Sequence, residues 1–138
     1  CGDGRTLCHD ASYEGSLFGN LALQEPLPDG APRPKKQASR WYRRNPKDPQ
    51  PVSVWEDQQQ RRFTSFIVSE DQLLVTGHPE ADHDQCFLAS INIEDGATTW
   101  EIDLPSQAVK GGTALDHEGR VYISLENGQL LCFAPRPE

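Results

Sequence analysis

The second half of the chain alternates short apolar runs with turns rich in Asp, Asn and Gly, and this alternation limits the folds open to it. Short β-branched or apolar runs bounded by such turns are typical of β-strands. Asp95-Gly96 and Asn127-Gly128 indicate hairpins, because both residue types tolerate positive φ. The pattern predicts an all-β fold with strands over residues 66–68, 72–76, 86–93, 98–104, 111–115, 120–125 and 129–133.

Composition excludes several other classes of fold. Gly and Pro each occupy 11 of the 138 positions, which argues against a helical bundle and against a coiled coil. No apolar run approaches the ~18 residues that a membrane-spanning helix requires. We therefore expect no membrane span.

The expected strands fall into two units that repeat. The first unit starts near Phe66 and the second near Thr113, so the period is about 45 residues. The first unit has four short strands, with Trp100 on the fourth, whereas the second unit has three. This period with four short strands per unit is typical of β-propeller blades.

Two segments carry a more specific pattern. Residues 88–92 (LASIN) precede Asp95-Gly96 and Trp100, and residues 119–124 (GRVYIS) precede residues 127–133 (NGQLLCF). In these residues the chain resembles the PQQ-like β-propeller repeats of the quinoprotein dehydrogenase-like superfamily, in particular the C-terminal blades of secreted PQQ-like proteins from planctomycete-type bacteria. The resemblance covers about half of the chain, residues 63–134. It implies a partial β-propeller of about two four-stranded blades, preceded by an irregular Pro-rich segment.

The resemblance also implies a partner. A propeller typically has 4–8 blades, each of which buries its faces against its neighbours, so two blades cannot close a ring. We expect another protein chain to supply the remaining blades, and Trp100 to pack in the core of its own blade. Without the partner, we expect the blade faces to be exposed to solvent. These faces carry Ile67, Leu74, Ile91, Trp100, Val121 and Leu130.

Composition and charge divide the chain into three parts. These are an irregular or short-stranded N-terminal segment (1–25), a Pro-rich basic connector (26–62) and the propeller blades (63–138). Further short strands are expected near residues 5–9, 16–23 and 52–56, and a polar break over 57–62.

The charge is unevenly spread along a chain whose net charge is −8. Residues 33–62 carry a charge of +6, whereas residues 63–138 carry −10. Trp41 and Tyr42 lie among arginines, an arrangement that can stack on single-stranded bases. Because the acidic half would repel phosphate, we expect no nucleic-acid partner and expect the connector to dock on an acidic protein surface.

The four cysteines are Cys1, Cys8, Cys86 and Cys132, and none forms a CxxC pair. An even count in such a chain fits an oxidising compartment and one or two disulfides, whose connectivity stays open. Cys1 at the start favours an internal fragment of a longer protein, with a lipoprotein anchored through Cys1 as the alternative. We expect a periplasmic or extracellular location.

No catalytic, cofactor-binding or metal-binding residue can be assigned from the resemblance. PQQ-dependent dehydrogenases use an Asp base, a calcium or lanthanide ion held by Glu, Asn and Asp, a tryptophan floor and often a Cys-Cys disulfide, and none of these matches this chain. Asp95, Asp116 and Glu118 are expected to be structural turn residues. The loop 78–84 contains five polar residues: His78, Glu80, Asp82, His83 and Asp84. These side chains could bind zinc, copper or manganese. Alternatively, the loop is simply polar and exposed to solvent.

We therefore expect a non-catalytic propeller segment that acts as a binding or assembly module and holds no cofactor. The alternative is a subunit or fragment of a quinoprotein- or haem-linked oxidoreductase, with the cofactor on the partner chain.

Overall fold

The computed structural model describes residues 5–10, 20–26, 29 and 52–135, which form ten strands and no helix. The strands are β1 (Thr6–Asp10), β2 (Asn20–Gln24), β3 (Ser53–Glu56), β4 (Arg61–Val68), β5 (Gln72–Pro79), β6 (Phe87–Asn92), β7 (Thr98–Asp103), β8 (Ala108–Leu115), β9 (Val121–Leu125) and β10 (Leu130–Phe133). The all-β prediction is confirmed for this part of the chain, which also has no helix long and apolar enough to cross a membrane.

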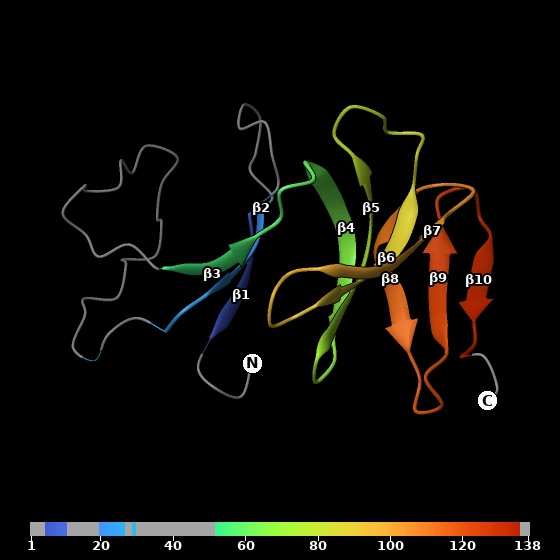
Figure 1. The fold of residues 1–138 in the computed structure, drawn as a ribbon. Coiled ribbons are helices and arrows are strands. Elements are labelled where there is room, and N and C mark those ends of the chain that lie inside the picture. Colours follow the sequence, from blue (N-terminus) through green and yellow to red (C-terminus); the bar gives the residue numbers. More distant parts are fainter. Residues whose placement is uncertain (1–4, 11–19, 27–28, 30–51, 136–138) are drawn as a thin grey trace, which may run out of the picture.

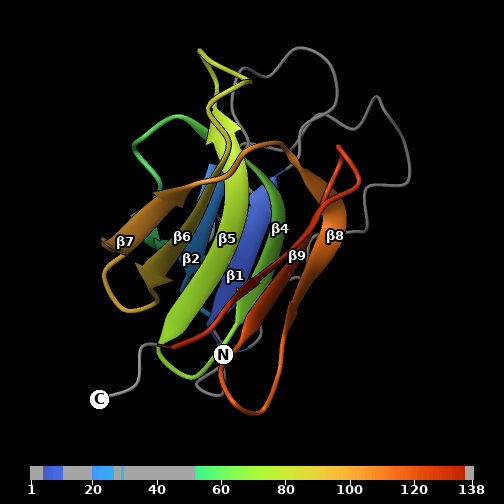
Figure 2. The same cartoon turned by 90° about the vertical axis from the view of Figure 1, so that its right-hand side faces the viewer.

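The strands form three antiparallel sheets that lie side by side (Figures 1 and 2). The first sheet has the order β1-β2-β3, the central sheet β4-β5-β6-β7 and the third sheet β10-β9-β8. Each sheet is a meander, because strands adjacent in sequence pair with each other. The chain passes from β3 to β4 and from β7 to β8, and β4 packs against β8.

The middle strands of the central sheet, β5 and β6, are buried on both faces, and each face belongs to a separate core. Along β5 the side chains alternate, so that Leu73 and Val75 face the first core and Leu74 faces the second. The first core joins the first and central sheets: Leu21, Leu23, Phe63, Leu73, Val75, Phe87, Ala89, Ile91 and Ile93. The second core joins the central and third sheets: Leu74, Cys86, Leu88, Leu104, Ala108, Val121, Ile123 and Leu125.

This packing corrects the expectation of solvent exposure for part of the six apolar residues named above. Leu74, Ile91 and Val121 are buried, because the central sheet is covered by a neighbouring sheet on each side. Trp100 and Leu130 are exposed, at 43% and 68% of their surface.

Strand β4 corrects the expected polar break over 57–62, because it begins at Arg61. Its pairing with β5 is interrupted by a bulge between Phe63 and Ser65. Opposite this bulge the backbones approach so closely that a Cβ atom on Gly77 would lie 2.0 Å from the carbonyl oxygen of Arg62. Only glycine fits this position.

The two predicted Gly turns are present, but only the glycines adopt positive φ. The φ angles of Gly96 and Gly128 are 73° and 85°, whereas Asp95 and Asn127 are not among the residues with positive φ. Asp95 instead accepts a hydrogen bond from the backbone N–H of Ala97 at 2.9 Å. This side-chain bond fixes the turn without a second left-handed residue.

The N-terminal predictions are met in part. Strands β1, β2 and β3 overlap the expected strands near 5–9, 16–23 and 52–56. Residues 16–19 and the connector residues 27–28 and 30–51, with Trp41 and Tyr42, lie outside the described residues.

Candidate functional site

Trp55 on β3 fastens the first sheet to the central sheet. Its indole Nε1–H donates a hydrogen bond of 2.7 Å to the carbonyl oxygen of Ile93, just beyond β6. Its ring lies against Gly96, where a Cβ atom would come within 2.6 Å of Trp55 Cδ2. The turn between β6 and β7 is therefore shaped to receive an indole from the neighbouring sheet.

Trp100 on β7 occupies the corresponding place one sheet further on. It lies 45 positions after Trp55, which equals the period expected from the sequence. It faces the end of β10 across an open groove of about 380 Å³, lined by Leu74, Trp100, Leu115, Gly119, Val121, Phe133, Ala134 and Pro135. The prediction that Trp100 packs in the core is wrong, because no Gly turn like that at Gly96 covers it within the described chain.

A second and more polar groove of about 500 Å³ lies between β4 and β8, and we call it the β4–β8 groove. Its polar lining residues are Thr64, Ser65, Gln107, Lys110, Thr113 and Glu126. The backbone N–H of Glu126 donates to the carbonyl oxygen of Gln107 at 2.8 Å, which ties the β9–β10 turn to the entrance of β8. Sequence analysis missed this groove, because its residues share no motif.

The loop weighed as a metal site holds its polar groups in other contacts. His78 belongs to β5 rather than to a loop, is buried, and donates from Nδ1 to the carbonyl oxygen of Pro79 at 2.8 Å. Its ring lies 4.5 Å from that of His83, centroid to centroid. Asp82 accepts a hydrogen bond from the backbone of Asp84. Within the part of the chain that the structure describes, no three His, Cys, Asp or Glu side chains converge as metal ligands.

Glu80 at the start of this loop forms an ion pair with Arg62 through two hydrogen bonds. The hydrogen bond from Arg62 lowers the pKa of Glu80 below its usual value. A carboxyl group with a lowered pKa stabilises the fold at pH values above its unfolded pKa, and the contribution is lost as pH falls through the folded pKa.

We therefore expect the E80Q variant to be less stable than the wild type near neutral pH, and the difference to shrink as the pH falls below about 4. Chemical denaturation across this pH range measures the difference. Glu70, an exposed residue without an ion pair among the described residues, provides the control variant E70Q. A difference between wild type and E80Q that is independent of pH would contradict the ion-pair explanation.

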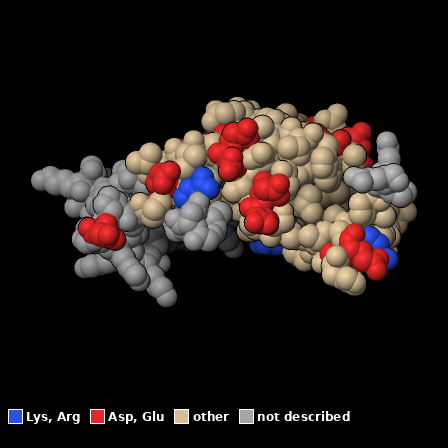
Figure 3. Space-filling model, turned by 60° about the horizontal axis from the view of Figure 1, so that its bottom comes forward, with Lys and Arg blue, Asp and Glu red and all other residues tan. Residues whose placement is uncertain are grey.

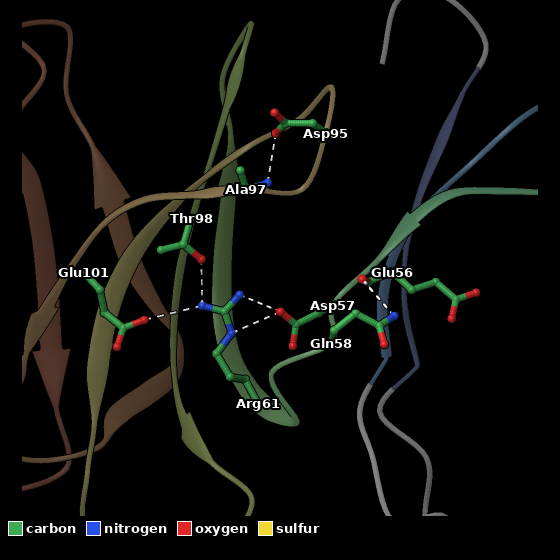
Figure 4. A network of polar contacts seen from close by, with 8 residues as sticks. All are labelled: Glu56, Asp57, Gln58, Arg61, Asp95, Ala97, Thr98 and Glu101. Carbon is green, nitrogen blue, oxygen red and sulfur yellow. Dashed lines mark hydrogen bonds and ion pairs between the residues drawn. The ribbon is translucent and has the colours of Figure 1, made fainter.

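Arg61 is the centre of a buried polar cluster between the first and central sheets, which we call the Arg61 cluster (Figure 4). Its guanidinium donates two hydrogen bonds to Asp57, at 2.5 and 3.1 Å, and the two side chains are only 3% and 6% exposed. It also reaches Thr98 and Glu101 on β7. Its Cζ atom lies 5.4 and 5.6 Å from the ring centroids of Phe63 and Phe87.

Two arginines assigned to the basic connector, Arg61 and Arg62, belong to strand β4 instead. They pair with acidic residues of the chain itself, Asp57, Glu101 and Glu80, and Asp57 lies within the predicted connector. These pairs are therefore contacts of the folded sheets rather than docking of a connector. For the basic residues at 33–47, which lie outside the described residues, the docking stays a prediction.

The turn carboxylates have the structural role that was expected. Asp116 accepts hydrogen bonds from the backbone of Glu118 and from Arg120, whose Nε lies 2.6 Å away. Burial raises the pKa of Asp116, but the hydrogen bonds from Arg120 and Glu118 outweigh it, so that the net pKa is lowered.

Cys86 and Cys132 are both free thiols, the first buried and the second exposed. Of the one or two disulfides that were expected, this excludes two, while a single bridge between Cys1 and Cys8 stays a prediction. Burial raises the pKa of the Cys86 thiol, which keeps it in its less reactive protonated form.

Comparison with known proteins adds no identification: no family model, curated protein or solved structure matches this chain.

Proposed function

We propose that the three sheets are successive blades of a PQQ-like β-propeller, and that the chain is a non-catalytic binding or assembly module that completes a ring with another chain. The recurrence of the tryptophan position carries the proposal. Trp55 docks on the turn after β6, and Trp100, one period later, lies across an open groove from the end of β10. A position that recurs with the sequence period is expected of repeats that stack on their neighbours.

The strand order supports the same arrangement. The chain leaves the first and central sheets from the edge strands β3 and β7 and enters the next sheet at the edge strands β4 and β8. If the four-stranded central sheet is a complete blade, then among the described residues the first sheet lacks a strand beside β1 and the third sheet lacks a strand beside β10.

Exposed apolar side chains lie where the absent strands would pack. Phe66 and Val68 on β4 are each 46% exposed, although their partners on β5, Val75 and Leu73, are buried in the first core. A further strand beside β1 would cover this part of β4, as β8 does on the opposite face. At the other end of the stack, the edge strand β10 carries the exposed Leu130.

The charge of the surface bears on the kind of partner. Figure 3 shows one face of the molecule, on which Asp and Glu side chains cover more of the described surface than Lys and Arg do. Such a surface disfavours nucleic acid, and we propose a protein partner in a periplasmic or extracellular setting.

The proposal predicts that the full chain, isolated from its source under native conditions, has a mass above its own 15.4 kDa because a different polypeptide copurifies. Native mass spectrometry measures this. The L130K variant places a charge on β10 and is expected to reduce the recovered partner at least about tenfold, whereas E94K, on the exposed β6–β7 turn, retains it.

A cooperative monomer of 15.4 kDa with no partner would overturn the assembly proposal. An absorbance spectrum of the complex distinguishes the assembly proposal from the oxidoreductase alternative, because the alternative requires a quinone or haem band.

A further inference from the structure

The β4–β8 groove contains two hydroxyl groups that have no hydrogen-bond partner within the described part of the chain, and of the two oxygen atoms only Thr113 Oγ1 is itself buried. Ser65 is 7% exposed, lines the groove and makes no side-chain hydrogen bond within the described part of the chain. The Oγ1 atom of Thr113, on the facing strand, is buried and also lacks a partner there. A buried hydroxyl without a partner is unfavourable, and a ligand that bonds to Thr113 Oγ1 would remove this cost.

The bulge in β4 gives this wall of the groove its polar character. Ser65 pairs with Thr76 across the strands, and the Thr64 hydroxyl also bonds to the Thr76 hydroxyl at 2.9 Å. Two consecutive residues of β4 therefore present hydroxyl groups near the same buried threonine. Thr64 is engaged in this bond, which leaves Ser65 available to a ligand.

The remaining polar groups define the chemistry of the ligand. The amide of Gln107 and the hydroxyls of Ser65 and Thr113 can both donate and accept hydrogen bonds. Lys110 and Glu126 carry opposite charges, and neither forms an ion pair among the described residues, so the groove favours no net charge on its ligand. Its volume of about 500 Å³ lies in the range of small-molecule sites.

We propose that the β4–β8 groove binds a neutral saccharide. The hydroxyl groups of a sugar donate and accept hydrogen bonds as the lining groups do, and they would satisfy Ser65 and Thr113 together. This inference uses only β4, β8 and the turn at Glu126, so it does not depend on whether the sheets belong to a propeller.

The test is a titration of the isotope-labelled full chain, with any copurifying partner left in place, followed by NMR. The probes are glucose, galactose, mannose, N-acetylglucosamine, maltose and cellobiose. We expect at least one of them to shift the backbone amide signals of Ser65, Lys110 and Thr113. The S65A/T113V double variant should bind that sugar at least about tenfold more weakly, while T99A, which removes a hydroxyl on β7 outside the groove, leaves binding unchanged.

Stability provides a second and independent readout. Without sugar, T113V removes an unsatisfied hydroxyl, so its melting temperature should equal or exceed that of the wild type. Weaker binding by a fold that is no less stable would be due to the site itself. The proposal is overturned if none of the six sugars shifts the groove signals, if the double variant binds as the wild type does, or if T99A weakens binding equally.

Discussion

Replacement of Arg61 by methionine is expected to lower the free energy of unfolding by about 3–5 kcal/mol, because it leaves the buried carboxylate of Asp57 without its partner. The variant also loses the hydrogen bond to Thr98 and the placement of the guanidinium near Phe63 and Phe87. Urea denaturation followed by circular dichroism measures the effect.

The chain contains a matched control for this experiment. Arg120 and Asp116 form an ion pair with the same spacing of four residues, but the arginine side chain is 39% exposed rather than 3%. Exposed pairs contribute little, so R120M should lose far less stability than R61M. The R61M/D57N double variant should regain part of the loss, because no buried charge is then left unpaired. Equal losses in R61M and R120M would show that burial of the Arg61 cluster is not what makes it stabilising.

The second large effect is expected from G77A, which should lower the free energy of unfolding by about 3 kcal/mol. The new methyl group would lie 2.0 Å from the carbonyl oxygen of Arg62 and 3.1 Å from Cα of Phe63, so the β4 backbone would have to move. Thermal melts with calorimetry measure the loss.

The comparison for G77A is G128A, at a glycine with φ of 85° and no atom within 4 Å of the added Cβ. This change meets only the strain of the left-handed conformation, about 1–2 kcal/mol. A G77A variant as stable as the wild type would mean that β4 and β5 can separate at the bulge without cost.

The strands from β5 to β10 could be predicted at least in part, because most are short apolar or alternating runs that end at turn residues, whereas only residues 66–68 of β4 were predicted. The burial of Arg61 could not, since it depends on Asp57, Thr98 and Glu101, which only the folded chain brings together. The burial of the two tryptophans could not be predicted either, because both lie on strands of similar sequence. Trp55 is half-buried and Trp100 is more exposed, and the difference depends on the part of the neighbouring sheet that each indole meets.

The β4–β8 groove could not be predicted for a related reason. The bulge between Phe63 and Ser65 has no sequence signal, yet it brings two hydroxyl-bearing residues to one wall. Gly77, which permits the close approach at the bulge, directly follows the predicted strand 72–76, and nothing in the sequence marks this approach.

The two cores on opposite faces of the central sheet have a mechanical consequence. Among the residues that the structure describes, each outer sheet packs on the central sheet through one core, and β5 and β6 take part in both cores. Loss of one outer sheet would leave half of the central sheet's packing in place. Local unfolding is therefore expected to start in the outer sheets and to proceed toward the central sheet. Backbone amide protons should exchange with solvent most slowly in β5 and β6, the middle two strands of the central sheet.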